Sequence, residues 1–255
     1  DLLLSRFSGQ YLESCRDKTP IYLYDRETIE ERVSELISLK SIDKVHYALK
    51  SNSFPPLVRL IEQLGLSFDC VSWGEIAYLV ENIPDIAPHK IVFTPNFAAI
   101  DEYQKALTLG CIITIDNLSL LEKYGHLFKN NSIFVRFDLE NAMGHHRYVQ
   151  TAGEESKFGI SIDDIDQVVR VCEQYSISVV GFHSHVGSGI FTPSTWSDSA
   201  RKLLSFVKKF PQVKILDLGG GLGVPEKPLQ RPLNISEMSR LFTQFVNEFP
   251  AYEIW

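Results

Sequence analysis

Lys50 is the residue whose position in this chain most directly suggests chemistry. It lies in the stretch KVHYALKSNS, directly after the alternating apolar residues Val45, Tyr47 and Leu49. This alternation predicts a β-strand that ends at the lysine. One interpretation is a lysine whose stem covers apolar surface while its amine stays in water. The other is an amine held in a pocket, where desolvation favours the neutral form that attacks a carbonyl carbon.

A run of glycines forms a second candidate site. The stretch LDLGGGLGVP predicts a buried strand that leads into Gly219, Gly220 and Gly221. It lacks the G-x-G-x-x-G spacing and a following Lys-Ser/Thr, so neither a dinucleotide fingerprint nor a P-loop is supported. Successive glycines let backbone N–H groups converge on an anion, although a tight turn without a ligand fits them equally well. A phosphate here and an amine at Lys50 together suggest a phosphorylated aldehyde, pyridoxal phosphate (PLP), held as an imine.

Two histidines belong to the same hypothesis. In GFHSHVGSGI, His183 and His185 alternate along a predicted strand and therefore share a face. One of them can lie against the pyridine ring, with Ser188 near the phosphate; a core histidine bonded to a carbonyl is the alternative. A metal site would add His145 and His146, but no carboxylate follows a metal-binding spacing such as HExxH, and we expect no metal.

Strand and helix patterns alternate along most of the chain. Short β-branched or aromatic runs predict eight strands, at 45–51, 67–72, 90–95, 111–116, 133–138, 179–186, 214–219 and 252–255. Amphipathic stretches between them predict helices, and this alternation is typical of parallel βα units. The fold class is therefore α/β, a (β/α)8 TIM barrel over residues 41–255 that is truncated in strand eight.

The C-terminal ends of the strands are where such a barrel carries its chemistry. The side chains at these ends are those of Lys50, Asp69, Ser72, Asn96, Asp116, Asn117, Arg136 and His185, together with the three glycines. A lysine, an arginine, a histidine and several carboxylates around one mouth favour the pocket interpretation of Lys50. The loop after strand five, 139–160, is long enough to suggest a functional role.

The segment before the barrel is left over from this count. The run PIYLYD at 20–25 predicts a strand, and residues 26–39 predict a helix. We therefore expect residues 1–40 to form a separate N-terminal segment, whose strand belongs to a second, smaller β-domain missing from this chain.

Composition narrows the class of protein. The 255 residues carry a net charge of −7 with no basic run, which argues against nucleic acid as a partner. No apolar stretch approaches the length of a membrane span, and no signal-peptide pattern opens the chain. The four cysteines are scattered without a CxxC pair, which predicts reduced, mostly buried thiols in the cytoplasm. Because the chain starts without Met and stops inside a predicted strand, we expect it to be part of a longer protein.

Several motifs, in order along the chain, resemble one enzyme family. YALKSN, FDCVSWGEI, GHH followed by TAGEESKFGI, HSHVGSGI and LDLGGGLGVP are similar to the fold type III, alanine-racemase-like PLP-dependent decarboxylases of basic amino acids. Within this family they most resemble the diaminopimelate decarboxylases, through the 143–160 loop. HVGSG is closer to the ornithine type, and the form fused to aspartate kinase is similar at both places, so an excised part of such a fusion is a hypothesis.

The resemblance implies roles for particular residues. Lys50 matches the lysine that binds PLP, and His185 matches the histidine that stacks on its ring. The other matched positions support the cofactor, its phosphate or its lysine; they are Asp69, Glu75, Arg136, Ser188, Gly219, Gly220 and Gly221. The function implied is decarboxylation of meso-diaminopimelate to L-lysine, in a cytoplasmic homodimer.

The resemblance also shows a departure. Family members continue after strand eight with a Glu-Pro-Gly-Arg motif, whose glutamate pairs with the pyridine nitrogen, and then with a β-domain that contributes a cysteine and a tyrosine. None of these follows Trp255 here, so we expect this 255-residue piece to have little activity alone. The alternatives are an ornithine- or arginine-type decarboxylase, a Schiff-base aldolase or racemase on the same barrel, and a non-catalytic homologue that binds PLP or a partner protein.

Overall fold

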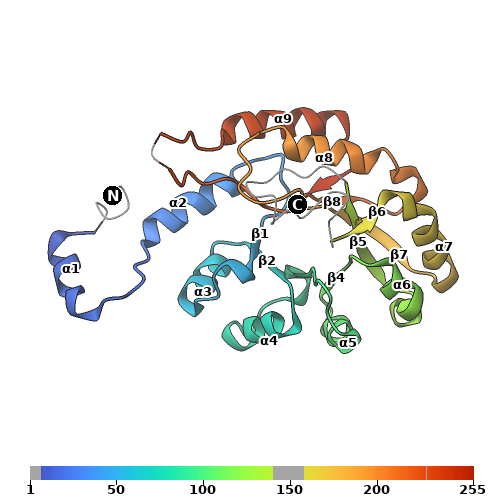
Figure 1. The fold of residues 1–255 in the computed structure, drawn as a ribbon, viewed down its shortest axis with the longest axis horizontal. Coiled ribbons are helices and arrows are strands. Elements are labelled where there is room, and N and C mark those ends of the chain that lie inside the picture. Colours follow the sequence, from blue (N-terminus) through green and yellow to red (C-terminus); the bar gives the residue numbers. More distant parts are fainter. Residues whose placement is uncertain (1–6, 140–157, 228) are drawn as a thin grey trace. The chain divides into compact units, whose positions relative to one another are not determined.

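The computed structural model describes residues 7–139, 158–227 and 229–255 (Figure 1). The chain divides into two compact units, Asp1–Leu39 and Lys40–Trp255. The first unit contains helix α1 (Gly9–Ser14), a 3-10 turn and helix α2 (Arg26–Ile37). Helix α2 begins where the side chain of Asp25 accepts a hydrogen bond from the Thr28 N–H at 3.0 Å, a typical N-cap.

The structure corrects one sequence prediction in this unit. Residues 21–25, within the predicted strand 20–25, form no strand. A strand exists only where a neighbouring strand completes its hydrogen-bond ladder. The nine strands in the described parts of the chain all belong to one sheet in the second unit.

The second unit is built on a parallel sheet whose strands follow the predicted eight. These are β1 (His46–Ala48), β2 (Ser67–Cys70), β3 (Ile91–Phe93), β4 (Ile112–Ile115), β5 (Ser132–Asp138), β7 (Ser178–His183), β8 (Ile215–Asp217) and β9 (Glu253–Ile254). They are ordered in space as in sequence, and every neighbouring pair is parallel. A short strand that the sequence did not predict, β6 (Ile160–Ser161), pairs with β5 outside this order.

The two ends of the sheet meet. The Asp43 N–H, just before β1, donates to the Ile254 carbonyl in β9 at 2.8 Å, and the Ile254 N–H donates to the Asp43 side chain at 2.8 Å. The next residue, Trp255, packs its ring 5.1 Å from His46 of β1 and 5.3 Å from Phe134 of β5, measured between ring centroids. The sheet therefore curls round to bring its first and last strands together, as a barrel requires.

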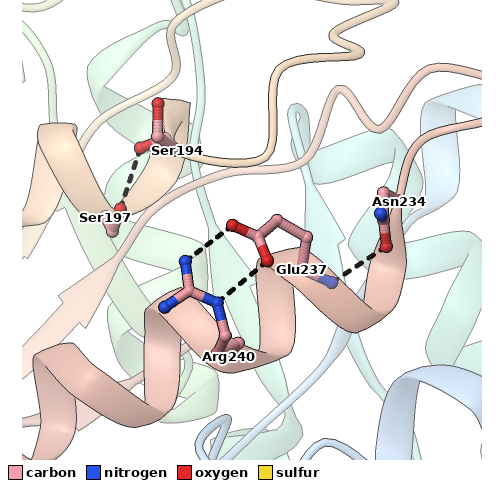
Figure 2. A network of polar contacts seen from close by, with 5 residues as sticks. All are labelled: Ser194, Ser197, Asn234, Glu237 and Arg240. Atoms are coloured by element: carbon pink, nitrogen blue, oxygen red, sulfur yellow. Dashed lines mark hydrogen bonds and ion pairs between the residues drawn. The ribbon is translucent and has the colours of Figure 1, made fainter.

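Helices cover the outside of this sheet (Figure 1). They are α3 (Pro55–Gln63), α4 (Trp73–Asn82), α5 (Ile100–Leu109), α6 (Leu118–Tyr124), α7 (Ile165–Tyr175), α8 (Thr195–Leu204) and α9 (Ile235–Glu248). Figure 2 shows how α9 begins, with the Asn234 side chain accepting from the Glu237 N–H at 2.9 Å and Glu237 paired with Arg240 at 2.7 Å. No helix in the described ranges is both long and apolar enough to cross a bilayer.

The four cysteines are buried and free, as the sequence predicts. Burial raises the pKa of Cys111 to about 11 and that of Cys172 to about 12. These thiols therefore stay protonated near neutral pH, which makes them poor nucleophiles.

A cluster of phenylalanines fills the space between sheet and helices on one side. Phe182 of β7 is fully buried, and its ring centroid lies 5.2 to 5.4 Å from those of Phe137, Phe206 and Phe210. Phe182→Ala should therefore lower the free energy of unfolding by about 3–5 kcal/mol. Urea unfolding measures the change. Val224→Ala, at a residue that is 74% exposed, is the control; an equal loss in both variants would contradict the role of this cluster.

Candidate active site

Lys50 lies at the mouth of the barrel, in a 3-10 turn (Leu49–Ser51) directly after β1. The turn is held by hydrogen bonds from the Ser51 hydroxyl to the Ala48 carbonyl at 2.7 Å and from the Tyr47 hydroxyl to the Asn52 carbonyl at 3.0 Å. Leu49 points into the core, whereas Lys50 is exposed. The expected burial of this lysine is therefore wrong: it lies in the turn after the strand, and it is exposed.

Two carboxyl groups lie within electrostatic reach of Lys50. Asp69 of β2 accepts a hydrogen bond from the Thr94 hydroxyl, and burial raises its pKa even though the nearby Lys50 acts in the opposite direction. Glu75, in the first turn of α4, accepts from the Val71 N–H at 2.8 Å. Burial raises the pKa of Glu75 as well, again opposed by Lys50. Lys50 therefore acts electrostatically on both Asp69 and Glu75.

Arg136 is a buried cation inside the barrel. It belongs to β5 and is only 8% exposed. Burial lowers the pKa of its guanidinium, and four carboxylates oppose that effect, those of Asp116, Asp69, Asp217 and Asp138. Its guanidinium carbon lies 4.8 Å from the centre of the Phe158 ring, within cation–π range. Arg136 therefore balances the negative charge of the barrel interior.

His185 follows β7 and lies against the glycine turn. A Cβ placed on Gly219 would be 2.7 Å from Nδ1 of His185, so this turn passes close to the imidazole ring. Burial, and then the charge of Arg136, lowers the pKa of His185 to about 3. The ring is therefore neutral near pH 7.

The second half of the glycine turn is joined to the loop after β7. The Ile190 N–H donates to the Gly221 carbonyl at 2.8 Å, and a Cβ on Gly221 would lie 2.0 Å from the Gly187 carbonyl oxygen. The Gly220 carbonyl accepts from the indole N–H of Trp196 at 3.1 Å, while its α-carbon faces open space. Ser188 is exposed on the loop between Gly187 and Ile190. The two glycine-containing segments therefore form one cradle at the mouth.

Other residues predicted at the strand ends have different roles. Ser72 and Asn117 are helix N-caps, accepting from the N–H groups of Glu75 at 3.2 Å and Leu120 at 3.1 Å. Asp116 is buried near Arg136. Asn96 has a buried side-chain oxygen for which the described residues offer no hydrogen-bond partner.

A metal centre is not assembled from the described residues, which hold no group of three or more His, Cys, Asp or Glu side chains suited to one. His145 and His146, along with most of the 139–160 loop, lie outside the described ranges.

Sequence reasoning did not single out Asp217 as a candidate site residue. Asp217 ends β8, and its Oδ2 lies 3.4 Å from Nδ1 of His183 on the neighbouring strand. The sequence places Asp217 two residues before Gly219, but it does not show that His183 lies opposite.

Burial of the His46 side chain, in β1, makes the free energy of unfolding depend on pH. Burial is the main cause that lowers the pKa of His46 from 6.5 to about 4. Between these values the unfolded chain binds a proton that the folded chain does not, so stability falls as pH decreases. His46→Phe should reduce this pH dependence of the unfolding free energy by up to about 1.4 kcal/mol per pH unit. Unfolding at pH 7, 6, 5 and 4 measures it, with the exposed His89→Phe as control; an unchanged slope would contradict the assignment.

The chain is similar to known proteins of one family. Residues 26–254 match the family described as pyridoxal-dependent decarboxylase, pyridoxal binding domain. The diaminopimelate decarboxylase of Methanothermobacter thermautotrophicus is 31% identical over 235 residues, covering 88% of this chain and 54% of that protein. That of Aquifex aeolicus is 31% identical over 224 residues, covering 82% and 52%.

A solved structure shares the fold. Diaminopimelate decarboxylase from Helicobacter pylori, complexed with L-lysine, superposes with a TM-score of 0.82 at 22% identity, covering 97% of this chain and 64% of that one. The chain spans about half the length of the curated relatives it matches.

Proposed function

Because this chain belongs to the pyridoxal-binding domain family of pyridoxal-dependent decarboxylases, we propose that the protein decarboxylates meso-diaminopimelate to L-lysine. The observation that carries the proposal is the cradle of two glycine segments beside His185, with the Lys50 amine at the same mouth. The names of the relatives at 31% identity support the substrate. A cytoplasmic homodimer, and a barrel domain at 41–255 preceded by a separate segment at 1–40, belong to the same proposal.

The side chains around the mouth fit PLP. The turn at Gly219 and Gly221 has positive φ values of 65° and 85°, and a Cβ at either position would collide with neighbouring atoms. Backbone N–H groups in such a turn suit a phosphate. A neutral imidazole lies beside the turn at His185, and a primary amine is exposed at Lys50. The residues that we propose hold the cofactor are Lys50, Asp69, Glu75, Arg136, His185, Ser188, Gly219, Gly220 and Gly221.

In this proposal each side chain has a separate task. Lys50 provides the amine that binds the cofactor aldehyde, while Asp69 and Glu75 hold negative charge near that amine. His185 supports one face of the ring, and Arg136 balances the carboxylates beneath it. When bound, PLP supplies a ring that accepts the electron pair left as CO₂ departs.

A substrate panel tests the proposed reaction. Because the chain spans about half the length of its curated relatives, the assay uses the chain extended to their length. It is given PLP and, separately, meso-diaminopimelate, ornithine and arginine, and both CO₂ and the amine product are measured. We expect CO₂ and L-lysine from diaminopimelate alone. Release of CO₂ only from ornithine or arginine would refute the substrate. A visible cofactor spectrum without CO₂ from any amino acid would favour the non-catalytic alternative.

A further inference from the structure

We propose that Asp217 and His183 form a positioning pair that fixes the glycine turn and, through it, the ring of His185. The inference rests on the proposed PLP site, in which neither residue has a role so far.

Asp217 connects the turn to the neighbouring strand with its two carboxylate oxygens. It is only 9% exposed at the end of β8. Its Oδ1 accepts a hydrogen bond from the Gly219 N–H at 3.0 Å, and its Oδ2 lies 3.4 Å from Nδ1 of His183. The backbone joins the same two strands, since the Ser184 N–H donates to the Asp217 carbonyl at 2.9 Å. The first glycine of the cradle is therefore tied to β7.

Gly219 transmits this restraint to His185. Its positive φ of 65° places its α-carbon against the ring and the preceding backbone. A Cβ there would be 2.7 Å from Nδ1 of His185 and 2.8 Å from the Ser184 carbonyl oxygen. Because no space separates them, a shift of the turn displaces the ring.

The surrounding charges keep Asp217 ionised. Burial alone would raise its pKa, but the charge of His183 and, more weakly, that of His46 lower it to about 2. The other charged or titratable groups that act on this region are Arg136, Asp69 and His185. His183 itself is buried, and neither of its ring nitrogens has a hydrogen-bond partner among the described residues.

The test compares Asp217→Ala with Asp217→Asn in the full chain. Alanine removes both the acceptor of the Gly219 N–H and the charge, whereas asparagine keeps an acceptor oxygen. Three quantities are measured: hydrogen exchange of the Gly219 amide, the NMR signals of the His185 ring, and the dissociation constant of PLP. Asp101→Asn, at an exposed residue paired with Lys105 at 2.8 Å, is the matched control.

In Asp217→Ala we expect faster exchange at Gly219, shifted His185 signals and PLP binding weaker by about tenfold or more. Asp217→Asn should recover most of the protection at Gly219. If the alanine variant does not fold, the asparagine variant is compared with the unaltered chain instead. Unchanged Gly219 and His185 signals, or an equal rise in exchange at every amide, would overturn the positioning role. The first two quantities are read without PLP. If the unaltered chain, extended to the length of its curated relatives, fails to bind PLP while they respond as expected, the proposed function fails and the positioning pair stands.

Discussion

Lys50→Arg should abolish the covalent capture of PLP. Arginine keeps a positive charge beside Asp69 and Glu75, but a guanidinium does not lose its proton near neutral pH and is no nucleophile. In the chain extended to the length of its curated relatives, activity should fall by at least about 10³-fold, since no other group replaces the amine. The measurement is direct: the protein is mixed with PLP, reduced with borohydride, digested, and mapped by mass spectrometry for the labelled peptide.

The control for this experiment is Lys105→Arg, on the outer helix α5, where the lysine pairs with Asp101. That variant should carry the label on the peptide containing Lys50, as the unaltered protein does. A label on a different lysine, or equal labelling of the Lys50→Arg variant, would refute the assignment of Lys50 and leave its exposed amine as a surface group.

Gly221→Ala should damage the site more than any other single methyl group added to the cradle. The new Cβ would lie 2.0 Å from the Gly187 carbonyl oxygen, at a residue whose φ is 85°. A left-handed conformation costs a non-glycine residue about 1–2 kcal/mol before any collision is counted. We expect the unfolding free energy to fall by about 3 kcal/mol or more, and the two glycine segments to separate. Thermal unfolding and PLP titration measure the two effects.

Gly220→Ala is the matched comparison, one residue away. Nothing lies within 4 Å of a Cβ at this position. The ligand-free protein should therefore keep its stability, while PLP binding weakens if the open side of the turn receives the phosphate. Equal destabilisation by both substitutions would show that the packing of the cradle is described wrongly. Normal PLP binding in both would place the phosphate elsewhere.

The regular part of the fold follows from the sequence because strands β2 to β5, β7 and β8 are largely buried and leave short apolar runs. Ile91–Phe93, for example, is fully buried along its length, and its residues are all apolar. The predicted strand at 20–25 also contains β-branched and aromatic residues, but these do not supply a neighbouring strand, and no strand forms there. The two-residue strand Ile160–Ser161 is too short to leave any pattern.

Site residues were predictable only where a reactive or charged side chain lies at the end of a predicted strand. Lys50 and Arg136 are unusual residue types for a strand, so their positions were informative. Ser72 and Asn117 occupy equivalent positions, yet they cap helices, because a residue between strand and helix serves either purpose. Asp217 was overlooked for a third reason, since its partner His183 is remote in sequence and only the register of β7 and β8 brings the two opposite each other.

The hydrogen bond between Ile254 and the Asp43 side chain spans 211 positions in the sequence. Closing a loop of that length costs on the order of 5 kcal/mol of chain entropy, which must be overcome before the contact can stabilise the fold. Pairing among strands β1 to β8 has a smaller entropic cost, because each strand pairs with one close to it in sequence. Folding of the unit should therefore proceed strand by strand from one edge of an open sheet. Its closure waits until the last strand has left the ribosome, and until then two unpaired edges are exposed to other chains.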